Sequence, residues 1–335
     1  MTSPLFTCIG NACTDIITSA NDAFLEKYNI KKSFCTHLET EDHLKEIKSA
    51  LNFYELISGG AAANTAHTLS ALDATVNFLA KITNDREGLS FLQNTKDAGI
   101  SSAMHVEKNT QLCSPQVLCF ITPDGDRTFA SYNGVATEFS HEHIPQDVIE
   151  KTDILYLDGY TLCSPAIPDA YLKATKLIHK NGGLTCMNVG DRSLIDMHET
   201  TIRTLLAASD GFICNLAEAQ ALYGDEKSAE EIAPILAKTF TFGAVTDGAN
   251  GAYLYHKGNI HFQPAEDISH LGQIDSIGAG DHFSAAILYG IAYNWSLRNI
   301  GKLANLCALD CLSHPGGRPR GGKGSLKHLV EEAQT

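Results

Sequence analysis

The stretch Asp275-Ser276-Ile277-Gly278-Ala279-Gly280-Asp281 precedes an apolar run, residues 282–293, whose composition predicts a helix. Gly278 and Gly280 can hold backbone angles that other residues resist, and the first N–H groups of the following helix lack intrahelical partners. Free N–H groups and the helix macrodipole together attract phosphate. The stretch therefore predicts an anion-binding turn.

Asp281 places a carboxylate beside this predicted anion site. A carboxylate there is unfavourable unless it has a function, and accepting the proton of an attacking hydroxyl is such a function. The same residues also fit a glycine turn before a helix, with Asp281 as a stabilising charge in the first helical turn. The seven residues alone leave both interpretations open.

The composition is that of a globular protein, with 335 residues of which 44% are hydrophobic and 19% charged. This length allows one large α/β domain or two domains. The formal net charge of −14 argues against nucleic acid or an anionic membrane as a partner, because both require a cationic surface. An anionic substrate must therefore be held by local groups.

The ten cysteines include no CxxC pair, and several lie in apolar runs. This pattern predicts reduced, buried thiols. The first residues lack a basic segment followed by a long apolar one, and no run reaches the roughly 18 apolar residues that a membrane helix needs. We therefore expect a cytoplasmic protein without a membrane segment.

Predicted strands alternate with predicted helices from residue 153 onward. This alternation predicts parallel strands joined by right-handed crossovers in a doubly wound sheet. Such sheets bind ligands beyond the carboxyl ends of their strands. Polar residues fall at these predicted ends, namely Asn188, Asp191, Asn215, Glu218, Thr246 and Asp247.

A polar excursion and a predicted β-hairpin interrupt the first half of the chain. Residues 18–58 are polar with two helix-like pieces, and residues 111–121 and 127–132 flank a Pro-Asp-Gly-Asp turn. We expect these strands to form a small second sheet that acts as a lid. The expected division is a large domain of residues 1–15, 59–110 and 133–335, and a lid of residues 16–58 and 111–132.

Other nucleotide and metal motifs are missing or incomplete. The segment Gly317–Gly324 nearly spells GxxxxGK[ST], but it lacks the Ser/Thr, follows a predicted helix and contains Pro319, so we do not interpret it as a P-loop. A GxGxxG fingerprint fails at Phe283. The sequence has no HExxH, no zinc-spaced Cys/His set and no GxSxG elbow.

The remaining motifs resemble the PfkB (ribokinase-like) family of carbohydrate and nucleoside kinases over nearly the whole chain. Residues 275–283 match D-[ST]-x-G-A-G-D-x-F, and residues 59–64 match G-G-x-x-x-N. The resemblance implies a ribokinase-like doubly wound, mostly parallel sheet with helices on both faces and a small β-sheet lid. It also implies an ATP-dependent kinase that transfers the γ-phosphoryl group from Mg-ATP to a primary hydroxyl.

The resemblance assigns expected catalytic roles to five residues. The N–H groups of Gly278, Ala279 and Gly280 would stabilise the transferring phosphoryl group, because phosphoryl transfer depends on positioning and charge neutralisation. Asp281 would be the base. Arg127 would be a lid arginine that contacts the transferred phosphate, a role suited to the guanidinium fork.

Further positions are implied for the substrate, ATP and the metal. The substrate positions are Asn11, Asp15, Gly59, Gly60, Asn64 and Tyr160, whose ring can stack on a base or serve as a core tyrosine. The ATP positions are Thr246, Gly248 and Gly251 in a VTxGxxG-like turn, with Asn305 and Ala308 on a helix beside the adenine. Asn215 and Glu218 match an NxxE element that organises Mg²⁺ and phosphate through water. The resemblance leaves open whether a monovalent cation such as K⁺ takes part.

The substrate has two candidate classes. Residues 10–16 resemble the G-N-x-x-x-D-I opening of adenosine kinases, and residues 23–28 resemble their lid helix, so adenosine is the first expectation. A sugar such as ribose, fructose or 2-keto-3-deoxygluconate is the alternative, because bacterial chains with this opening are often sugar kinases. A non-catalytic nucleotide- or sugar-binding sensor is disfavoured by the presence of Asp281, Arg127 and the Asn215/Glu218 pair. The sequence is compatible with a monomer or a homodimer.

Overall fold

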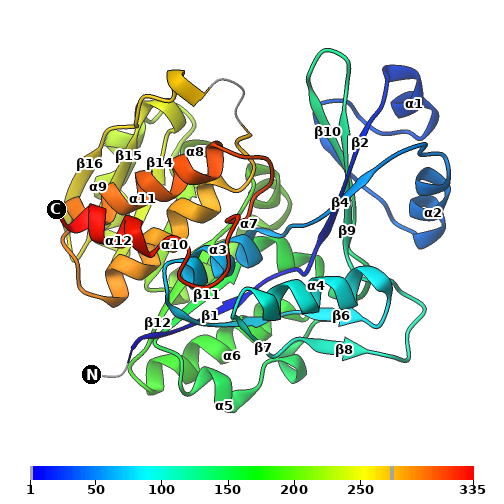
Figure 1. Cartoon of the computed structure of the whole chain (residues 1–335). Coiled ribbons are helices and arrows are strands. Elements are labelled where there is room, and N and C mark those ends of the chain that lie inside the picture. The colour runs from blue at the N-terminus through cyan, green and yellow to red at the C-terminus, as the bar shows by residue number, and fades with distance from the viewer. Residues whose placement is uncertain (1–2, 272–274) are drawn as a thin grey trace.

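The computed structural model describes residues 3–271 and 275–335 (Figure 1). Its main sheet has nine strands in the order β16-β15-β14-β13-β12-β11-β1-β5-β7. The strands are β1 Leu5–Ile9, β5 Thr75–Leu79, β7 Ser101–Ser102, β11 Ile154–Asp158, β12 Leu184–Asn188, β13 Gly211–Asn215, β14 Phe242–Thr246, β15 Ala252–His256 and β16 Asn259–Gln263. Within this sheet β15 pairs antiparallel with both β14 and β16, and the other described pairs are parallel. The predicted large, mostly parallel sheet is confirmed.

Helices cover both faces of this sheet, so its central strands are nearly continuous apolar runs. One face packs under α3 Ala61–Ala71, α4 Arg86–Asp97, α10 Ala279–Ala292, α11 Leu297–Leu312 and α12 Lys327–Gln334. The other packs under α5 Gln146–Ile149, α6 Ile167–Lys180, α7 Arg192–Ala208, α8 Leu216–Tyr223 and α9 Ala229–Thr239. Along β11, Tyr156 belongs to the first core and Leu155 to the second, as the alternation of a strand requires.

The carboxyl ends of the parallel strands meet at one edge of the main sheet. Asp158 at the end of β11 lies beside Asn188 at the end of β12, and Asn215 at the end of β13 lies beside Thr246 at the end of β14. Ligands of doubly wound sheets bind along this edge. The register therefore gathers several of the predicted polar residues where a ligand would bind.

The second sheet has five strands in the order β3-β10-β9-β2-β4 and stands beside the main body at the upper right of Figure 1. Its strands are β2 Thr14–Ser19, β3 Cys35–His37, β4 Glu55–Ser58, β9 Gln116–Ile121 and β10 Arg127–Tyr132. Helices α1 Asp22–Lys27 and α2 Glu41–Ser49 cover it with a small core of their own. A further pair, β6 Lys81–Thr83 and β8 His105–Glu107, is two-stranded.

The structure differs from the sequence prediction at several boundaries. Asp15 lies within β2, which pairs with both β4 and β9, so it belongs to the small sheet and not to the segment expected in the large domain. The strand expected over residues 111–121 begins at Gln116. The helix expected over residues 282–293 begins at Ala279, because Gly278 takes the left-handed conformation that ends the preceding turn. The division into a large domain and a lid stays a proposal.

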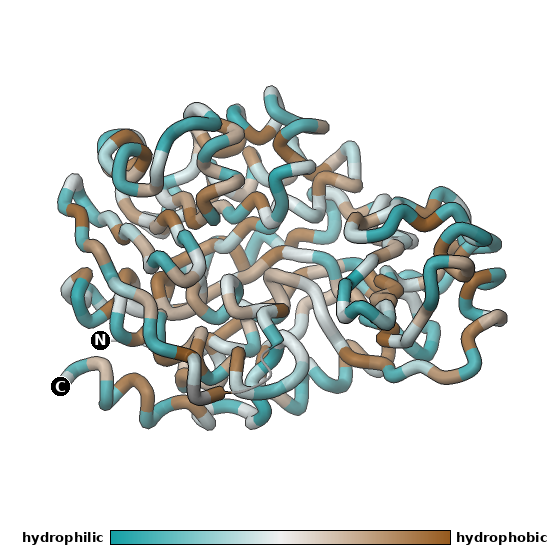
Figure 2. The backbone as a smooth tube through the Cα atoms, turned by 90° about the horizontal axis from the view of Figure 1, so that it is seen from above, coloured by the Kyte–Doolittle hydropathy of each residue, from teal (hydrophilic) through white to brown (hydrophobic). Residues whose placement is uncertain are grey.

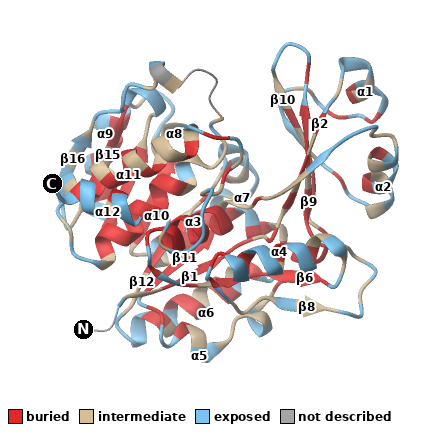
Figure 3. Cartoon of the chain, in the orientation of Figure 1, coloured by how far each residue is buried: buried red, intermediate tan, exposed pale blue. Residues whose placement is uncertain are grey.

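The two helices that carry the predicted site are almost entirely buried. All residues of α3 from Ala62 to Ala71 are buried, and so are those of α10 from His282 to Ile291 (Figure 3). Hydrophobic stretches run through the middle of the larger body, with hydrophilic turns on its outside (Figure 2). Among the described residues, none of the helices has the length and apolar content that a membrane crossing requires.

Candidate active site

The turn before α10 has the shape that its glycines predict. Gly278 has a φ angle of +84°, and a Cβ atom there would lie 2.4 Å from the Cα atom of Gly317. Backbone angle and space therefore both require glycine. Around Gly280, the described chain leaves the position of a Cβ atom free of other heavy atoms within 4 Å. The N–H of Ala279 donates to the carbonyl of Ser276 at 3.3 Å, so a bound anion would have to compete with this hydrogen bond.

Asp281 lies in the first turn of α10 and contacts α3. Its Oδ2 atom accepts a hydrogen bond from Nδ2 of Asn64 at 2.9 Å, and its backbone oxygen accepts one from the Thr65 hydroxyl at 3.3 Å. Burial raises the pKa of Asp281 to about 8, against the opposing hydrogen bond from Asn64. The charges of Asp158 and Glu218 raise this pKa further. A carboxylate that titrates near neutrality can accept a proton from a hydroxyl.

Asp15 packs directly against the Gly59-Gly60 turn at the start of α3. A Cβ atom on Gly59 would lie 2.1 Å from Oδ2 of Asp15. Gly60 has a φ angle of +91°, and a Cβ atom there would lie 2.4 Å from the carbonyl oxygen of Asn11. Glycine is therefore required at position 60 by the backbone, whereas a side chain at position 59 would displace the Asp15 carboxylate. Burial raises the pKa of Asp15 to about 7, and the positive charge of Arg318 opposes this increase.

Tyr160 and Asn11 meet at the carboxyl edge of the main sheet. Nδ2 of Asn11 donates a hydrogen bond to the backbone oxygen of Tyr160 at 3.0 Å. The Tyr160 hydroxyl donates to the carbonyl of Gly190 at 3.1 Å, and the ring packs on that glycine, where a Cβ atom would lie 2.4 Å away. Tyr160 is nevertheless 41% exposed, so part of its ring is open to a ligand.

Arg127, on β10, reaches the first residue of the anion turn. Its Nη1 atom donates to Oδ1 of Asp275 at 2.7 Å. The same carboxylate accepts hydrogen bonds from the backbone N–H of Ile277 at 3.0 Å and of Gly316 at 3.2 Å. Burial acts to raise the pKa of Asp275, but these bonds outweigh it and hold the pKa below its usual value. The small sheet is thereby joined to the anion turn.

Asn215 and Glu218 form a reciprocal cap at the start of α8. The Asn215 side chain accepts from the N–H of Glu218 at 2.9 Å and donates to its Oε1 at 2.7 Å. Burial raises the pKa of Glu218 to about 7. The hydrogen bond that the backbone N–H of Asn215 donates to this carboxylate lowers the pKa, and the charge of Asp191 raises it further. A cation would be favourable beside these groups.

The family resemblance implies a Mg²⁺ ion, and the side chains at Asn215 and Glu218 can be compared with what that ion requires. Within the described ranges, no cluster of three or more His, Cys, Asp or Glu residues forms a complete metal cage. Mg²⁺ commonly keeps several waters and binds one or two carboxylates together with substrate phosphates. The buried carboxylate of Glu218, with its raised pKa, fits such a water-mediated role.

The residues predicted at the ATP site fall in two places. Thr246 ends β14, Gly248 and Gly251 lie in the connection to β15, and Asn305 and Ala308 lie on α11. Gly248 and Gly251 have φ angles of +52° and +99°, which favour glycine. Nδ2 of Asn305 donates to the carbonyl of Pro264 at 2.7 Å. Helix α11 packs against β15 and β16, which places both sets near one end of the sheet.

Sequence reasoning missed two charged residues of this region. Asp158 is 1% exposed, and its carboxylate accepts hydrogen bonds from the N–H of Tyr160 at 2.9 Å and of Ala62 at 3.4 Å. Its position after a buried strand is the same signal that pointed to Asn188. Arg318 lies in the incomplete P-loop pattern of residues 317–324, and no local pattern indicates its contact with the site.

The model of the pfkB family of carbohydrate kinases matches residues 30–320. The chain therefore belongs to this family, and it is a kinase that acts on a hydroxyl of a sugar or nucleoside. An adenosine kinase structure from Sinorhizobium meliloti is 26% identical, with a TM-score of 0.86 over 99% of this chain and 98% of that chain. A probable sugar kinase from Rhizobium etli CFN 42 is also 26% identical, with a TM-score of 0.86 over 100% and 98%. A probable fructokinase-4 from Arabidopsis thaliana is 25% identical over 78% of this chain and 83% of its own length.

Proposed function

We propose that this kinase phosphorylates the primary hydroxyl of a nucleoside, with adenosine favoured, and uses Mg-ATP as donor. The main support for a nucleoside acceptor is Tyr160, whose side chain is 41% exposed at the ligand-binding edge of the sheet. Its backbone carbonyl accepts a hydrogen bond from Asn11. Base recognition commonly uses an exposed ring of this kind. The similarity to an adenosine kinase over nearly the whole chain supports the same substrate.

The proposed reaction places the primary hydroxyl between Asp281 and the anion turn. Asp281 accepts the hydroxyl proton while the new O–P bond forms and the bond from the γ-phosphorus to the ADP oxygen breaks. The N–H groups of Gly278, Ala279 and Gly280 would stabilise the charge that develops on the phosphoryl oxygens, and Ala279 would exchange its bond to the carbonyl of Ser276 for this one. Arg127 is hydrogen-bonded to Asp275, the first residue of the anion turn. In the proposed reaction its guanidinium group would contact the same phosphoryl group.

The remaining proposed roles concern binding. Asp15 and Asn64, with the Gly59-Gly60 turn, would hold the ribose hydroxyls, because their polar atoms lie beside the start of α3. Asn215 and Glu218 would hold Mg²⁺ through water, and the bound ion would neutralise charge on the phosphates. The ten free cysteines support our proposal of a reducing, cytoplasmic location.

A free sugar is the second candidate acceptor. The similarities to a probable sugar kinase and to a probable fructokinase-4 favour it. The proposed catalytic groups would serve either acceptor, because only the primary hydroxyl reacts. Tyr160 and the lid, and not Asp281, would therefore determine which of the two candidate acceptors is used.

The acceptor is tested by measuring ADP release from Mg-ATP with adenosine, other nucleosides, ribose, fructose and 2-keto-3-deoxygluconate. We expect turnover with adenosine, and we expect Tyr160→Leu to raise the KM for adenosine by about tenfold through loss of stacking. Tyr293→Leu is the matched control, because Tyr293 is similarly exposed, at 36%, but lies beyond the far end of α10. Turnover with a sugar alone would contradict the proposal of a nucleoside acceptor. No ADP release with any of these compounds would favour a non-catalytic sensor.

A further inference from the structure

The segment of residues 316–318 runs between the elements of the candidate active site. The N–H of Gly316 donates to Oδ2 of Asp275 at 3.2 Å. A Cβ atom on Gly317 would lie 2.7 Å from Nδ2 of Asn64, and the Cα atom of Gly317 blocks a side chain on Gly278. The segment therefore contacts the anion turn and α3 at the same time.

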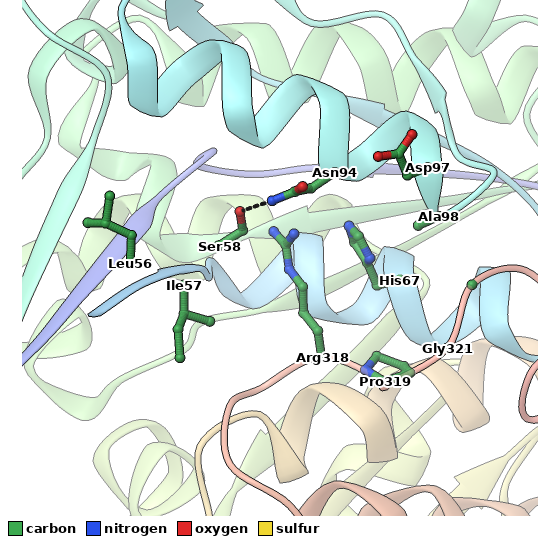
Figure 4. Close-up of a pocket in the computed structure, with 11 residues that line it drawn as sticks. Leu56, Ile57, Ser58, His67, Asn94, Asp97, Ala98, Arg318, Pro319 and Gly321 are labelled. Carbon is green, nitrogen blue, oxygen red and sulfur yellow. Dashed lines mark hydrogen bonds between the residues drawn. The ribbon is translucent and has the colours of Figure 1, made fainter. Parts of the chain in front are cut away.

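Arg318 extends from this segment to the turn that precedes α3. Its Nη2 atom donates a hydrogen bond to the carbonyl oxygen of Gly59 at 2.9 Å. Its guanidinium carbon lies 4.7 Å from the centroid of the Phe91 ring, within the range of a cation–π contact. Figure 4 shows the side chain of Arg318 between Ser58 and His67, in the wall of a pocket of about 420 Å³.

The charge of Arg318 is balanced by one nearby carboxylate of the site. Burial lowers the pKa of Arg318 to about 9, against the attraction of Asp15, so the side chain is still cationic at neutral pH. His67 lies in the same pocket, and burial, with a further contribution from Arg318, holds the pKa of His67 well below its usual value. His67 is therefore neutral. Asp97 also lines the pocket.

We propose that Arg318 is a positioning residue for the acceptor: it fixes the carbonyl of Gly59 and counterbalances the partly buried carboxylate of Asp15, so that the acceptor is held in line with the anion turn. The inference rests on the proposed function, because it assigns Asp15 to the acceptor. Arg318 would touch neither the acceptor nor the phosphoryl group. It would connect the C-terminal segment, which borders the anion turn, to the strands that carry the acceptor site.

Kinetic constants of two variants test this proposal. In Arg318→Gln we expect the acceptor KM to rise about tenfold or more, because a charge-assisted hydrogen bond and the balancing charge are both lost. The KM for ATP should change by less than about twofold. Arg320→Gln is the matched control, since Arg320 is exposed two residues further along the same segment. An equal rise of both KM values, or an unchanged acceptor KM, would overturn the proposal.

The pH dependence of acceptor affinity provides a readout that a merely structural role would not move. The titratable groups that face Asp15 are Arg318, Cys13 and Cys119. Because Arg318 lowers the pKa of Asp15, Arg318→Gln should move the acid limb of acceptor binding to higher pH. Arg318→Lys keeps the charge but loses the planar fork, so its limb should stay near the parent value. An unmoved limb in Arg318→Gln would contradict the proposed charge balance.

Amide hydrogen exchange separates this inference from the proposed function. Loss of the bond to Gly59 should speed exchange in residues 57–62 of Arg318→Gln but not of Arg320→Gln, whether or not any acceptor has been found. If the parent turns over no acceptor, the proposed function fails, while faster exchange still supports the positional role of Arg318. Unchanged exchange in Arg318→Gln overturns that role even if the parent is an active kinase.

Discussion

The side-chain amide of Asn64 donates a hydrogen bond of 2.9 Å to the carboxylate of Asp281, although 217 positions separate the two residues. Asn64 lies in the first turn of α3 and Asp281 in the first turn of α10. The bond therefore joins the helix that follows the Gly59-Gly60 turn to the helix that follows the anion turn. It also stabilises the charged form of Asp281, which is partly buried.

Removing this amide should change the pH at which Asp281 acts. The hydrogen bond from Asn64 lowers the pKa of Asp281, so Asn64→Ala should raise that pKa and move the acid limb of the kcat profile to higher pH. A pH–rate profile at saturating ATP measures the shift. Asn181→Ala, at an exposed position after α6, should leave the limb in place. An unchanged acid limb in Asn64→Ala would show that this hydrogen bond does not set the pKa of the group that limits kcat.

The raised pKa of Asp281 also has a consequence for stability. The folded protein holds the Asp281 proton up to about pH 8, while the unfolded chain releases it near the usual value of 3.8. The parent therefore loses stability as the pH rises between these values. Asp281→Asn removes this loss, so its free energy of unfolding should exceed that of the parent at pH 8 by about 1 kcal/mol or more. Urea unfolding at pH 4 and pH 8 should show the difference shrinking at pH 4, and a gain that is larger at pH 4 would refute the assignment.

The two glycines of the anion turn should respond differently to alanine. Gly278→Ala forces a side chain into a left-handed conformation and against Gly317, so we expect a loss of at least about 1 kcal/mol of stability. Gly280→Ala has space for its Cβ atom and should keep its stability. Because that space lies at the proposed phosphate site, Gly280→Ala should instead lower kcat/KM for ATP. Thermal unfolding and steady-state kinetics of the pair distinguish the two effects, and a stable Gly278→Ala protein would contradict the first.

Asp15 should affect the acceptor more than the donor. Asp15→Asn keeps the shape of the side chain but loses the charge that accepts hydrogen bonds from hydroxyls. We expect the acceptor KM to rise about tenfold or more and the KM for ATP to stay within about twofold. Asp196→Asn, an exposed position on α7, is the control. Equal changes in the two KM values would place Asp15 outside the acceptor site.

Much of the main sheet could be predicted from local patterns. The strands β1 and β12 have the bounds that their apolar runs predict, because strands buried on both faces are short, continuous hydrophobic segments between turns. Strand β2 was harder to place. Its sequence, TDIITS, alternates buried and partly exposed residues, and nothing local shows that it leaves the main sheet to pair with β4 and β9.

The contacts that assemble the candidate site are long-range, and this limits what the sequence reveals. The turn at Gly278 could be predicted because its chemistry lies within a few residues. The bond from Arg318 to Gly59 spans 259 positions and has no local signature. The contact between Gly59 and the side chain of Asp15 likewise exists only in the folded chain.

The central claim is that Asp281 takes the proton from the acceptor hydroxyl, and the most direct test is the kcat of Asp281→Asn. With the acceptor that the parent uses, we predict a loss of about 10³-fold or more in ADP release, because an amide cannot accept the proton. The KM for ATP should stay close to the parent value, since the anion turn is retained. A variant with kcat within about tenfold of the parent would contradict the claim.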